Sequence, residues 1–384
     1  MLNIFNIQTN IFINRIMNSH ILFYFHSMLF IGNVTPRKIF SVVCCQLPKN
    51  VSLHRIQNDN NMVNALRTLM VICLCALSSA VCMGQNVKIY DTSNSGLIDN
   101  DLWAVVVDHD GNKWLGTIKY GLIKFDSDTF TVFNKENSAI KGDCVTSLFV
   151  DSKGNLWAEY SRPDEGIVMY DGNEWTTFKA ADLGVESIDV RDIRETSDGA
   201  IWFAFPYKAM IYKDGAWSTM KIPADGIICM DIREDGSIAV GCSTPPTPLL
   251  IYSNGKWKKY TEKNSELQLG VIRGLKFRPD GALMIGYGGG FGGGGLSVLS
   301  SNFNVWTHYN KSNSQIPDHQ IQDIEYDGKN YWMASNNGLV KKDGATISAV
   351  FFREGMFKNV ISDIALEGKT LWIATNFGLI KYEP

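Results

Sequence analysis

Short apolar segments alternate with tight polar turns from residue 86 to the end of the chain. Segments such as CVTSLFVD (144–151) and QIQDIEYD (320–327) are rich in β-branched and aromatic residues, which favours β-strands. Asp-Gly pairs and similar turns separate them, and glycine supplies the positive φ that tight hairpins need. No stretch after residue 85 shows a long apolar stripe with the helical period of about 3.6 residues. The pattern therefore predicts an all-β protein.

The turns recur at a regular spacing along this part of the chain. Each copy carries a glycine at the same place in its turn: Gly111, Gly154, Gly199, Gly236, Gly281, Gly328 and Gly368. The repeating unit is about 40–45 residues long, the length of a four-stranded propeller blade. The seven copies predict a seven-bladed β-propeller with four antiparallel strands in each blade.

The two ends of this region predict how the ring closes. The last copy stops after a third strand, GLIKYEP (378–384), whereas the first begins with what reads as a lone fourth strand, NVKIY (86–90). Pairing these two segments completes the seventh blade and removes an open strand edge. We therefore expect the N-terminal strand to close the last blade.

Tryptophan marks the second strand of most copies. It opens this strand in five of them: Trp114, Trp157, Trp202, Trp332 and Trp372. A large side chain that recurs once in each repeat is typical of packing between neighbouring blades. We expect these residues to be structural.

The first 84 residues do not share the repeat. Residues 62–84 combine an early arginine, a short apolar core and small residues at the end, which is typical of a secretory signal peptide cleaved after Gly84. Lipidation at Cys82 is the second interpretation. We expect residues 1–61 to be a mis-called upstream extension or disordered, and residues 85–384 to form a secreted or periplasmic propeller without a transmembrane segment.

Charge and cysteine content exclude several classes of function. The formal net charge is −3, and no basic patch with interleaved aromatic residues is present, so we expect no nucleic-acid partner. Cys144, Cys229 and Cys242 follow the leader and have neither zinc spacing nor a disulfide framework. A two-residue turn on Asp235–Gly236 would place Cys229 opposite Cys242. They form either a strained disulfide or two buried thiols, and we favour the thiols.

Three segments, DHDGNKWLGTIKYGLIKF, YDGKNYWMASNNGLVKK and EGKTLWIATNFGLIKY, resemble the two-component regulator propeller repeat, which builds periplasmic sensor regions of hybrid histidine kinases in gut Bacteroidetes. The resemblance covers residues 86–384 and is weak in blades four and five, where Ala239 and Met284 occupy the tryptophan position. It implies a sensor propeller that binds a ligand such as a glycan. The family's β-sandwich, membrane helix and kinase do not follow Pro384, so we expect a stand-alone propeller acting with a separate signalling partner.

A glycine-rich stretch, GYGGGFGGGGLSVL (286–299), lies between the second and third predicted strands of blade five. A phosphate-binding loop would be followed by a helix, whereas a strand follows here. The loop is either an adaptable clasp carrying Tyr287 and Phe291 or a neutral glycine expansion, and we favour the expansion because long surface insertions cost little free energy.

Loops between second and third strands share one face of a propeller with the connections between blades. Aromatic, amide and cationic residues on this face are our candidate ligand-binding set: Lys119, Tyr120, Tyr160, Arg162, Tyr207, Lys208, Tyr287, Phe291, His319, Asn336 and Phe377. Aromatic faces stack on sugars and amides orient them through hydrogen bonds, so the set suits an oligosaccharide or a small anion.

We expect a binding protein rather than an enzyme, with no catalytic residues, metal site or cofactor. The histidines after the leader, His109, His308 and His319, are not brought together by the repeat. Two alternative functions stay open. One is a propeller lyase or hydrolase with its site at the channel mouth, and the other is a protein–protein interaction scaffold.

Two sets of charged residues leave further interpretations. The first consists of acids near the innermost strands, which are either cation ligands or, as we favour, solvated strand ends: Asp189, Asp192, Asp323 and Asp363. The second consists of arginines at similar positions in successive blades, which sialidase chemistry would need together with a Tyr–Glu pair that we do not find: Arg191, Arg233 and Arg273.

Overall fold

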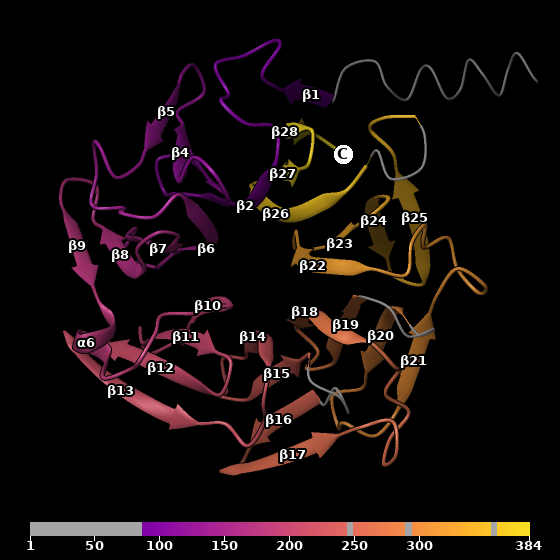
Figure 1. Cartoon of the computed structure of the whole chain (residues 1–384). Helices are drawn as coiled ribbons and strands as arrows, with labels where there is room; N and C mark the ends of the chain where they lie inside the picture. The colour runs from indigo at the N-terminus through magenta and orange to yellow at the C-terminus, as the bar shows by residue number, and fades with distance from the viewer. Residues whose placement is uncertain (1–86, 244–248, 289–293, 355–358) are drawn as a thin grey trace, which may run out of the picture. The chain divides into compact units, whose positions relative to one another are not determined.

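The computed structural model of the chain describes residues 87–243, 249–288, 294–354 and 359–384. The predicted signal peptide, its upstream extension and Phe291 lie outside the described residues. Gly84–Pro384 form one compact unit. Within it, the described chain builds seven four-stranded antiparallel sheets arranged as the blades of a ring (Figure 1), so the predicted all-β, seven-bladed propeller is confirmed.

Each blade runs outward from the centre of the ring through four strands (Figure 1). The innermost strands are β2 (Leu102–Val107), β6 (Cys144–Val150), β10 (Asp192–Glu195), β14 (Ile227–Ile232), β18 (Val271–Phe277), β22 (Ile321–Tyr326) and β26 (Ile361–Glu367). The second strands are β3 (Lys113–Thr117), β7 (Leu156–Ser161), β11 (Ile201–Phe205), β15 (Ile238–Cys242), β19 (Leu283–Gly288), β23 (Tyr331–Ser335) and β27 (Thr370–Thr375).

The two outer positions of each blade complete the sheets. The third strands are β4 (Leu122–Phe125), β8 (Gly166–Tyr170), β12 (Lys208–Lys213), β16 (Leu249–Ser253), β20 (Gly295–Leu299), β24 (Gly338–Asp343) and β28 (Gly378–Tyr382). The outermost strands are β5 (Phe130–Phe133), β9 (Trp175–Phe178), β13 (Ala216–Lys221), β17 (Lys256–Tyr260), β21 (Trp306–Tyr309), β25 (Thr346–Val350) and β1 (Val87–Tyr90). A short helix, α6 (Ala180–Leu183), connects blades two and three.

The ring closes through the N-terminal strand, as predicted. β1 pairs antiparallel with β28, with Val87 opposite Tyr382 and Tyr90 opposite Leu379. The Tyr90 ring lies 4.8 Å from that of Phe125 in blade one and 6.1 Å from that of Trp372 in blade seven. Innermost strands β26 and β2 are also in contact. One strand from the start of the propeller therefore completes the last blade and packs against the first.

The tryptophans of the second strands join neighbouring blades. The ring of Trp157 lies 5.5 Å from that of Phe203 in the next blade, and Trp332 lies 6.0 Å from Tyr382. The indole Nε1–H of Trp157 also donates a hydrogen bond of 2.9 Å to Asp151 in the turn before its strand. Equivalent indole bonds occur in blades one, six and seven. The predicted structural role is confirmed.

Blades four and five use a different contact at this place. Where blades one, two, six and seven have an acidic turn residue and a tryptophan, blade four has Arg233 and Ala239. The Arg233 guanidinium lies 5.3 Å from the centre of the Phe277 ring in the next blade. Arg278 in blade five lies 5.9 Å from the ring of Tyr331 in the same way. A cation over an aromatic ring thus replaces the buried indole between these blades.

The expected alignment of Cys229 with Cys242 is wrong. The turn of blade four spans residues 233–237, closed by the Arg233 N–H bonding to the Ser237 carbonyl at 2.8 Å, and it is longer than the predicted two-residue turn. The register therefore shifts, so that Cys229 lies opposite Gly241 and Cys242 lies opposite Ile227. Both cysteines are buried free thiols, as is Cys144. Among the described residues, no helix is long and apolar enough to cross a membrane.

Candidate functional site at the mouth of the channel

A β-bulge recurs near the start of the innermost strands. The register shifts at this point in blades one, two, four, five, six and seven. In blade three, β10 begins at the equivalent residue, Asp192, and the N–H of Arg191 donates to Ala204 at 2.8 Å. A bulge puts an extra residue into one strand and changes the direction of its side chain, and bulges are common next to functional sites.

The bulge has a signature in the sequence. Two apolar residues three positions apart flank it in every blade, where a regular strand would place them two apart. The pairs are Leu102 and Val105, Val145 and Leu148, Val190 and Ile193, Ile227 and Met230, Ile272 and Leu275, Ile321 and Ile324, and Ile361 and Ile364. Sequence reasoning on alternation alone misses this signal, because the strand still reads as a continuous apolar segment.

Two residues lie between the members of each apolar pair, and we call them the first and second bulge residues. The first lies at the end of the ring where the innermost strands begin, which we call the mouth. These seven residues are Trp103, Thr146, Arg191, Ile228, Arg273, Gln322 and Ser362. Trp103, Arg191 and Arg273 are exposed, with 47% of Trp103 accessible, and the other four are half-buried. The mouth therefore carries an exposed indole and two exposed guanidinium groups that were not in our predicted set.

The predicted loops lie at the same end of the ring. Loops between second and third strands are hydrogen-bonded to the segments that lead into the next innermost strand, as when Gly121 N–H donates to Asp143 at 2.9 Å and Gly295 N–H to His319 at 2.7 Å. The amide of Gln322 also donates to the side-chain oxygen of Asn336 at 3.0 Å. The bulges and the loops thus form one polar rim.

The structure separates the predicted ligand-binding residues into two groups. Those at the surface of the rim are fully or partly exposed: Lys119, Tyr120, Arg162, Tyr207, Lys208, His319 and Asn336. Tyr160, Tyr287 and Phe377 lie instead in the protein interior, with both tyrosines 0% exposed. We had expected these three at the rim because their positions adjoin the loops.

Each buried aromatic residue has a packing partner that explains its position. The Tyr287 hydroxyl accepts from the Gln268 N–H at 3.4 Å, within the link between blades four and five. The backbone of Gly166 lies directly against the Tyr160 ring. The Arg353 guanidinium covers the Phe377 ring at 4.3 Å. Tyr287 is therefore an interior residue of β19, opposite Gly295, and the glycine-rich stretch lies between β19 and β20 in the sequence, as expected.

Of the two arginines at the bulges, Arg273 is the one whose guanidinium is free to meet a ligand. Its aliphatic stem lies against Gly288, where an added Cβ would come within 2.3 Å of the arginine side chain, so glycine at 288 makes room for it. Among the described residues no carboxylate is paired with Arg273, whereas Arg191 is held by Asp189 at 2.8 Å. An exposed and uncompensated guanidinium suits an anionic group, which it can bind through paired hydrogen bonds.

Glu159 is a buried acid where the repeat otherwise has a small residue. The equivalent positions are Gly116, Ala204, Gly241, Gly286, Ala334 and Ala374. They are small because the next innermost strand lies against them: a Cβ on Gly116 would be 2.4 Å from the Val145 carbonyl.

The surroundings of Glu159 keep it protonated at neutral pH. The side chain is 4% exposed, and burial, together with the nearby carboxylate of Asp189, raises its pKa to about 8, although Arg191 opposes the shift. Its carboxyl group also hydrogen-bonds the Ser161 hydroxyl. A neutral carboxylic acid and an exposed carboxylate therefore lie together under the mouth.

The second bulge residue connects adjacent blades. Asp192 accepts a hydrogen bond of 2.8 Å from the Met230 N–H in the next blade, and Asp363 accepts one of 2.8 Å from Val105. Ser147 and Cys229 occupy the same position and donate to the next blade instead. Our preference for solvated strand ends is wrong for Asp192 and Asp363, because both carboxylates hold neighbouring innermost strands together.

Two positions after the second bulge residue, four successive innermost strands carry charged residues of alternating sign, which we call the charged belt. These residues are Arg194, Asp231, Lys276 and Glu325. Lys276 and Glu325 are 2.9 Å apart, and Arg194 lies 3.9 Å from Asp231. Arg194 also pairs with Asp192 at 2.5 Å. Every charge of this belt therefore has an opposite neighbour, and the pairs connect the innermost strands of neighbouring blades.

Asp323 and Asp363, at the second bulge position of blades six and seven, are buried side by side. The Asp363 carboxyl group is hydrogen-bonded to that of Asp323, and burial raises the pKa of both side chains. Two carboxylates in contact cannot both be ionised at little cost. Among the described residues, no group of three or more His, Cys, Asp or Glu side chains is arranged to hold a metal ion.

The three arginines at similar positions in successive blades do not lie together in the structure. Arg191 and Arg273 are bulge residues at the mouth, but Arg233 lies in the turn between β14 and β15, at the opposite end of the blade. The histidines are also apart. His308 is half-buried in β21 on a hydrogen bond of 2.7 Å to Ser297, whereas His319 is at the rim.

No protein-family model matches the chain, and no curated protein matches it in sequence. Solved structures do resemble it. The extracellular domain of the hybrid two-component system BT3049 from B. thetaiotaomicron is 18% identical with a TM-score of 0.63, over 77% of this chain and 41% of that one. A streptogramin B lyase is 16% identical with a TM-score of 0.61, over 78% of this chain and 98% of that one.

A second B. thetaiotaomicron extracellular domain, of the one-component system BT4673, is 15% identical with a TM-score of 0.56. This chain covers 40% of it, so the propeller spans about two fifths of the length of both extracellular domains. At these identities the likeness establishes the shared propeller fold. Structural neighbours thus include extracellular domains of two signalling systems from B. thetaiotaomicron.

Proposed function

We propose that this protein is a secreted or periplasmic propeller that binds an acidic oligosaccharide at its mouth and acts as a sensor module with a separate signalling partner. The observation that carries the proposal is the recurring bulge, which gathers Trp103, Arg191, Arg273 and Gln322 at one end of the ring. An indole can stack on a sugar ring, and an unpaired guanidinium can bind its carboxylate or sulfate.

The exposed loop residues extend this surface. Tyr120 and Tyr207 add aromatic area, and Lys119 and Lys208 add positive charge. The resemblance of the repeat to periplasmic sensor propellers supports a sensing role, as does the structural likeness to two extracellular sensor domains. Loops on a rigid ring are a common place for binding residues.

The test is titration of the full chain with oligogalacturonates and sulfated oligosaccharides, comparing wild type with Arg273→Gln. We expect acidic oligosaccharides to raise the unfolding temperature and Arg273→Gln to weaken binding about tenfold, the effect of one lost charge-assisted hydrogen bond. Lys256→Gln, on outer strand β17, makes the same charge change away from the mouth and should bind like wild type. Equal weakening by both variants, or no binding by any acidic sugar, would refute the proposal.

A lyase or hydrolase is the second candidate, and Glu159 is the observation that favours it. A carboxyl group with a pKa of about 8 can donate a proton at neutral pH, and the carboxyl group of Asp189 lies close to it, so the site holds the pair of carboxyl groups that acid–base catalysis often uses. The likeness in fold to a streptogramin B lyase is compatible with this alternative. Turnover of a bound sugar that disappears in Glu159→Gln would favour the enzyme over the sensor.

A further inference from the structure

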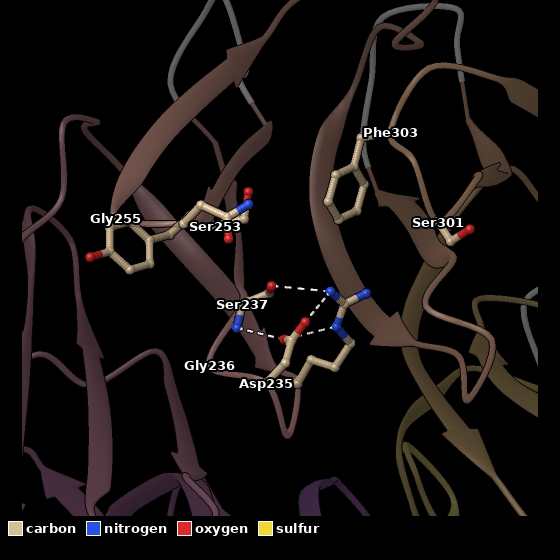
Figure 2. Close-up of a pocket in the computed structure, with 10 residues that line it drawn as sticks. Asp235, Gly236, Ser237, Ser253, Gly255, Ser301 and Phe303 are labelled. Atoms are coloured by element: carbon tan, nitrogen blue, oxygen red, sulfur yellow. Dashed lines mark hydrogen bonds and ion pairs between the residues drawn. The ribbon is translucent and has the colours of Figure 1, made fainter.

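A hollow of about 580 Å³ lies between blades four and five, at the end of the ring opposite the mouth. Three turns line it: those between β14 and β15, between β16 and β17, and between β20 and β21. Figure 2 shows Ser237 of blade four on one side and Phe303 of blade five on the other. Its volume is within the range of small-molecule sites.

The hollow lies where the repeat departs from its usual residues. In blades one, two, six and seven an indole from the second strand reaches the turn acid, as Trp157 reaches Asp151, but blade four has Ala239 and Arg233 at these positions. Arg233 turns instead toward blade five, where it donates to the Gly281 carbonyl at 3.2 Å. No indole therefore anchors this turn.

The charge of Arg233 is already neutralised. Its Nε donates to Asp235 at 2.9 Å, and its second terminal nitrogen bonds the other carboxylate oxygen of Asp235 (Figure 2). Ser237 accepts a further hydrogen bond from the same guanidinium at 3.2 Å. The lining thus presents no uncompensated charge, unlike the mouth.

Uncharged polar groups of the lining are free to bind a ligand. Four of its side chains have no hydrogen-bond partner in the part of the chain that the structure describes: Tyr252, Ser253, Asn254 and Ser301. The contrast with Tyr170, at the equivalent place in blade two, is informative, because its hydroxyl donates to the Gly172 carbonyl at 2.6 Å. The Tyr252 hydroxyl lacks such a bond.

Phe303 is held at the hollow in an unusual backbone conformation. Its φ of 58° is in the left-handed region, which a bulky residue rarely adopts and which costs free energy. Two hydrogen bonds maintain it: the Phe303 N–H donates to Ser300 at 2.8 Å, and the Tyr260 hydroxyl donates to the Phe303 carbonyl at 3.1 Å. The surrounding structure therefore fixes an aromatic ring at the edge of the hollow.

We propose that this hollow is a second ligand site, selective for a neutral sugar ring. The Phe303 ring at the edge of the hollow offers a face for the C–H side of a pyranose, and the hydroxyl and amide groups of the lining offer partners for its hydroxyls. The absence of uncompensated charge among the lining residues disfavours an acidic ligand. The site is distinct from the mouth in both position and charge.

The experiment is titration of the full chain with methyl glycosides of glucose, galactose, mannose and N-acetylglucosamine and with their disaccharides, followed by saturation-transfer NMR. Asn254→Gly removes the amide but suits the positive φ of 51° at this position, and Ser301→Tyr fills the exposed edge of the hollow. We expect at least one neutral sugar to bind and each variant to weaken its binding about tenfold.

Two controls make the result specific. Asp214→Gly makes the same kind of change in the equivalent turn of blade three, where φ is 50°, and should bind neutral sugars like wild type. Arg273→Gln alters the mouth and should also leave neutral-sugar binding unchanged. Absence of binding by every neutral sugar would overturn the proposal. So would binding that is lost in Arg273→Gln and retained in Asn254→Gly and Ser301→Tyr, since it would place the sugar at the mouth.

Discussion

At the scale of the residue, Glu159 shows how one departure from a repeat can create chemistry. Six blades hold glycine or alanine at this position because the next innermost strand lies against it. Blade two holds a carboxyl group at this position, and burial keeps the acid protonated rather than ionised. The side chain is therefore a hydrogen-bond donor under the mouth at neutral pH, where an ordinary glutamate would be an acceptor.

The pH dependence of folding should reveal this group. Between the usual glutamate pKa of 4.5 and the raised pKa of about 8, the folded protein keeps a proton that the unfolded chain has released. The free energy of unfolding should therefore fall as the pH rises through this window. Glu159→Gln cannot ionise, so at pH 8 it should be more stable than wild type by on the order of 4 kcal/mol, and the difference should vanish near pH 4.5.

Urea unfolding at a series of pH values measures this difference. Glu186→Gln changes an exposed glutamate in the same region and should follow wild type at every pH. If the stability difference between Glu159→Gln and wild type stays constant from pH 4.5 to pH 8, the pH dependence of unfolding comes from a group other than Glu159.

At the scale of the element, the turn and the second strand of a blade act as one unit. In blade six, Asp327 accepts hydrogen bonds from the Lys329 and Asn330 N–H groups, from the Asn330 amide and from the Trp332 indole. One carboxylate thus fixes the turn and orients the tryptophan that packs against blade seven. The acid in the turn and the tryptophan of the next strand are partners in a structural contact.

Asp327→Ala should therefore destabilise the propeller by about 2–3 kcal/mol, because it leaves a buried indole N–H and the turn amides unpaired. Burial alone would raise the pKa of Asp327, but the hydrogen bonds it accepts lower it to about 2. Its contribution is thus complete above pH 3.8 and is lost as the pH falls toward 2, and the variant should lack this part of the acid dependence. Chemical unfolding at pH 3 and pH 7 tests both effects.

The matched control is Asp110→Ala, which removes an exposed carboxylate from the equivalent turn of blade one without touching the indole bond. It should change stability by less than about 0.5 kcal/mol. Similar losses in the two variants would contradict a special role for the carboxylate bound to tryptophan.

The blades and their closure were predictable from local sequence, whereas the site was predictable only in part. Turn glycines and tryptophans such as Trp157 are short-range signals that recur at a fixed period, and they identify the fold. Burial of Tyr160 and Tyr287 depends on what the neighbouring segments place against them, and no local pattern encodes that contact. The bulge at Arg273 was readable as a three-residue spacing between apolar residues, but a search for strict alternation passes over it.

At the scale of the whole molecule, the closing strand holds the ring together. β1 supplies the outer edge of blade seven, and its Tyr90 packs against aromatic rings of blades one and seven. Without it, β28 would present an unpaired edge and the joint between the first and last blades would lose its aromatic contact.

A chain that begins at Asp91 should therefore lose at least about 3 kcal/mol of folding free energy and should associate through its open edge. Thermal unfolding and size-exclusion chromatography measure the two effects. A chain that begins at Gly84 keeps all of β1 and serves as the control. Equal stability of the two truncated chains would show that the ring closes without the strand.

The pairing of β1 with β28 also determines how the molecule responds to mechanical force. Val87 and Tyr382 lie opposite each other, so the outward ends of the two strands leave the pair at the same side. Tension applied through segments attached beyond these residues would peel the strands apart one hydrogen bond at a time, instead of shearing all of them together. Blade seven is therefore where the ring would open under load, while the other six blades would bear little of the force.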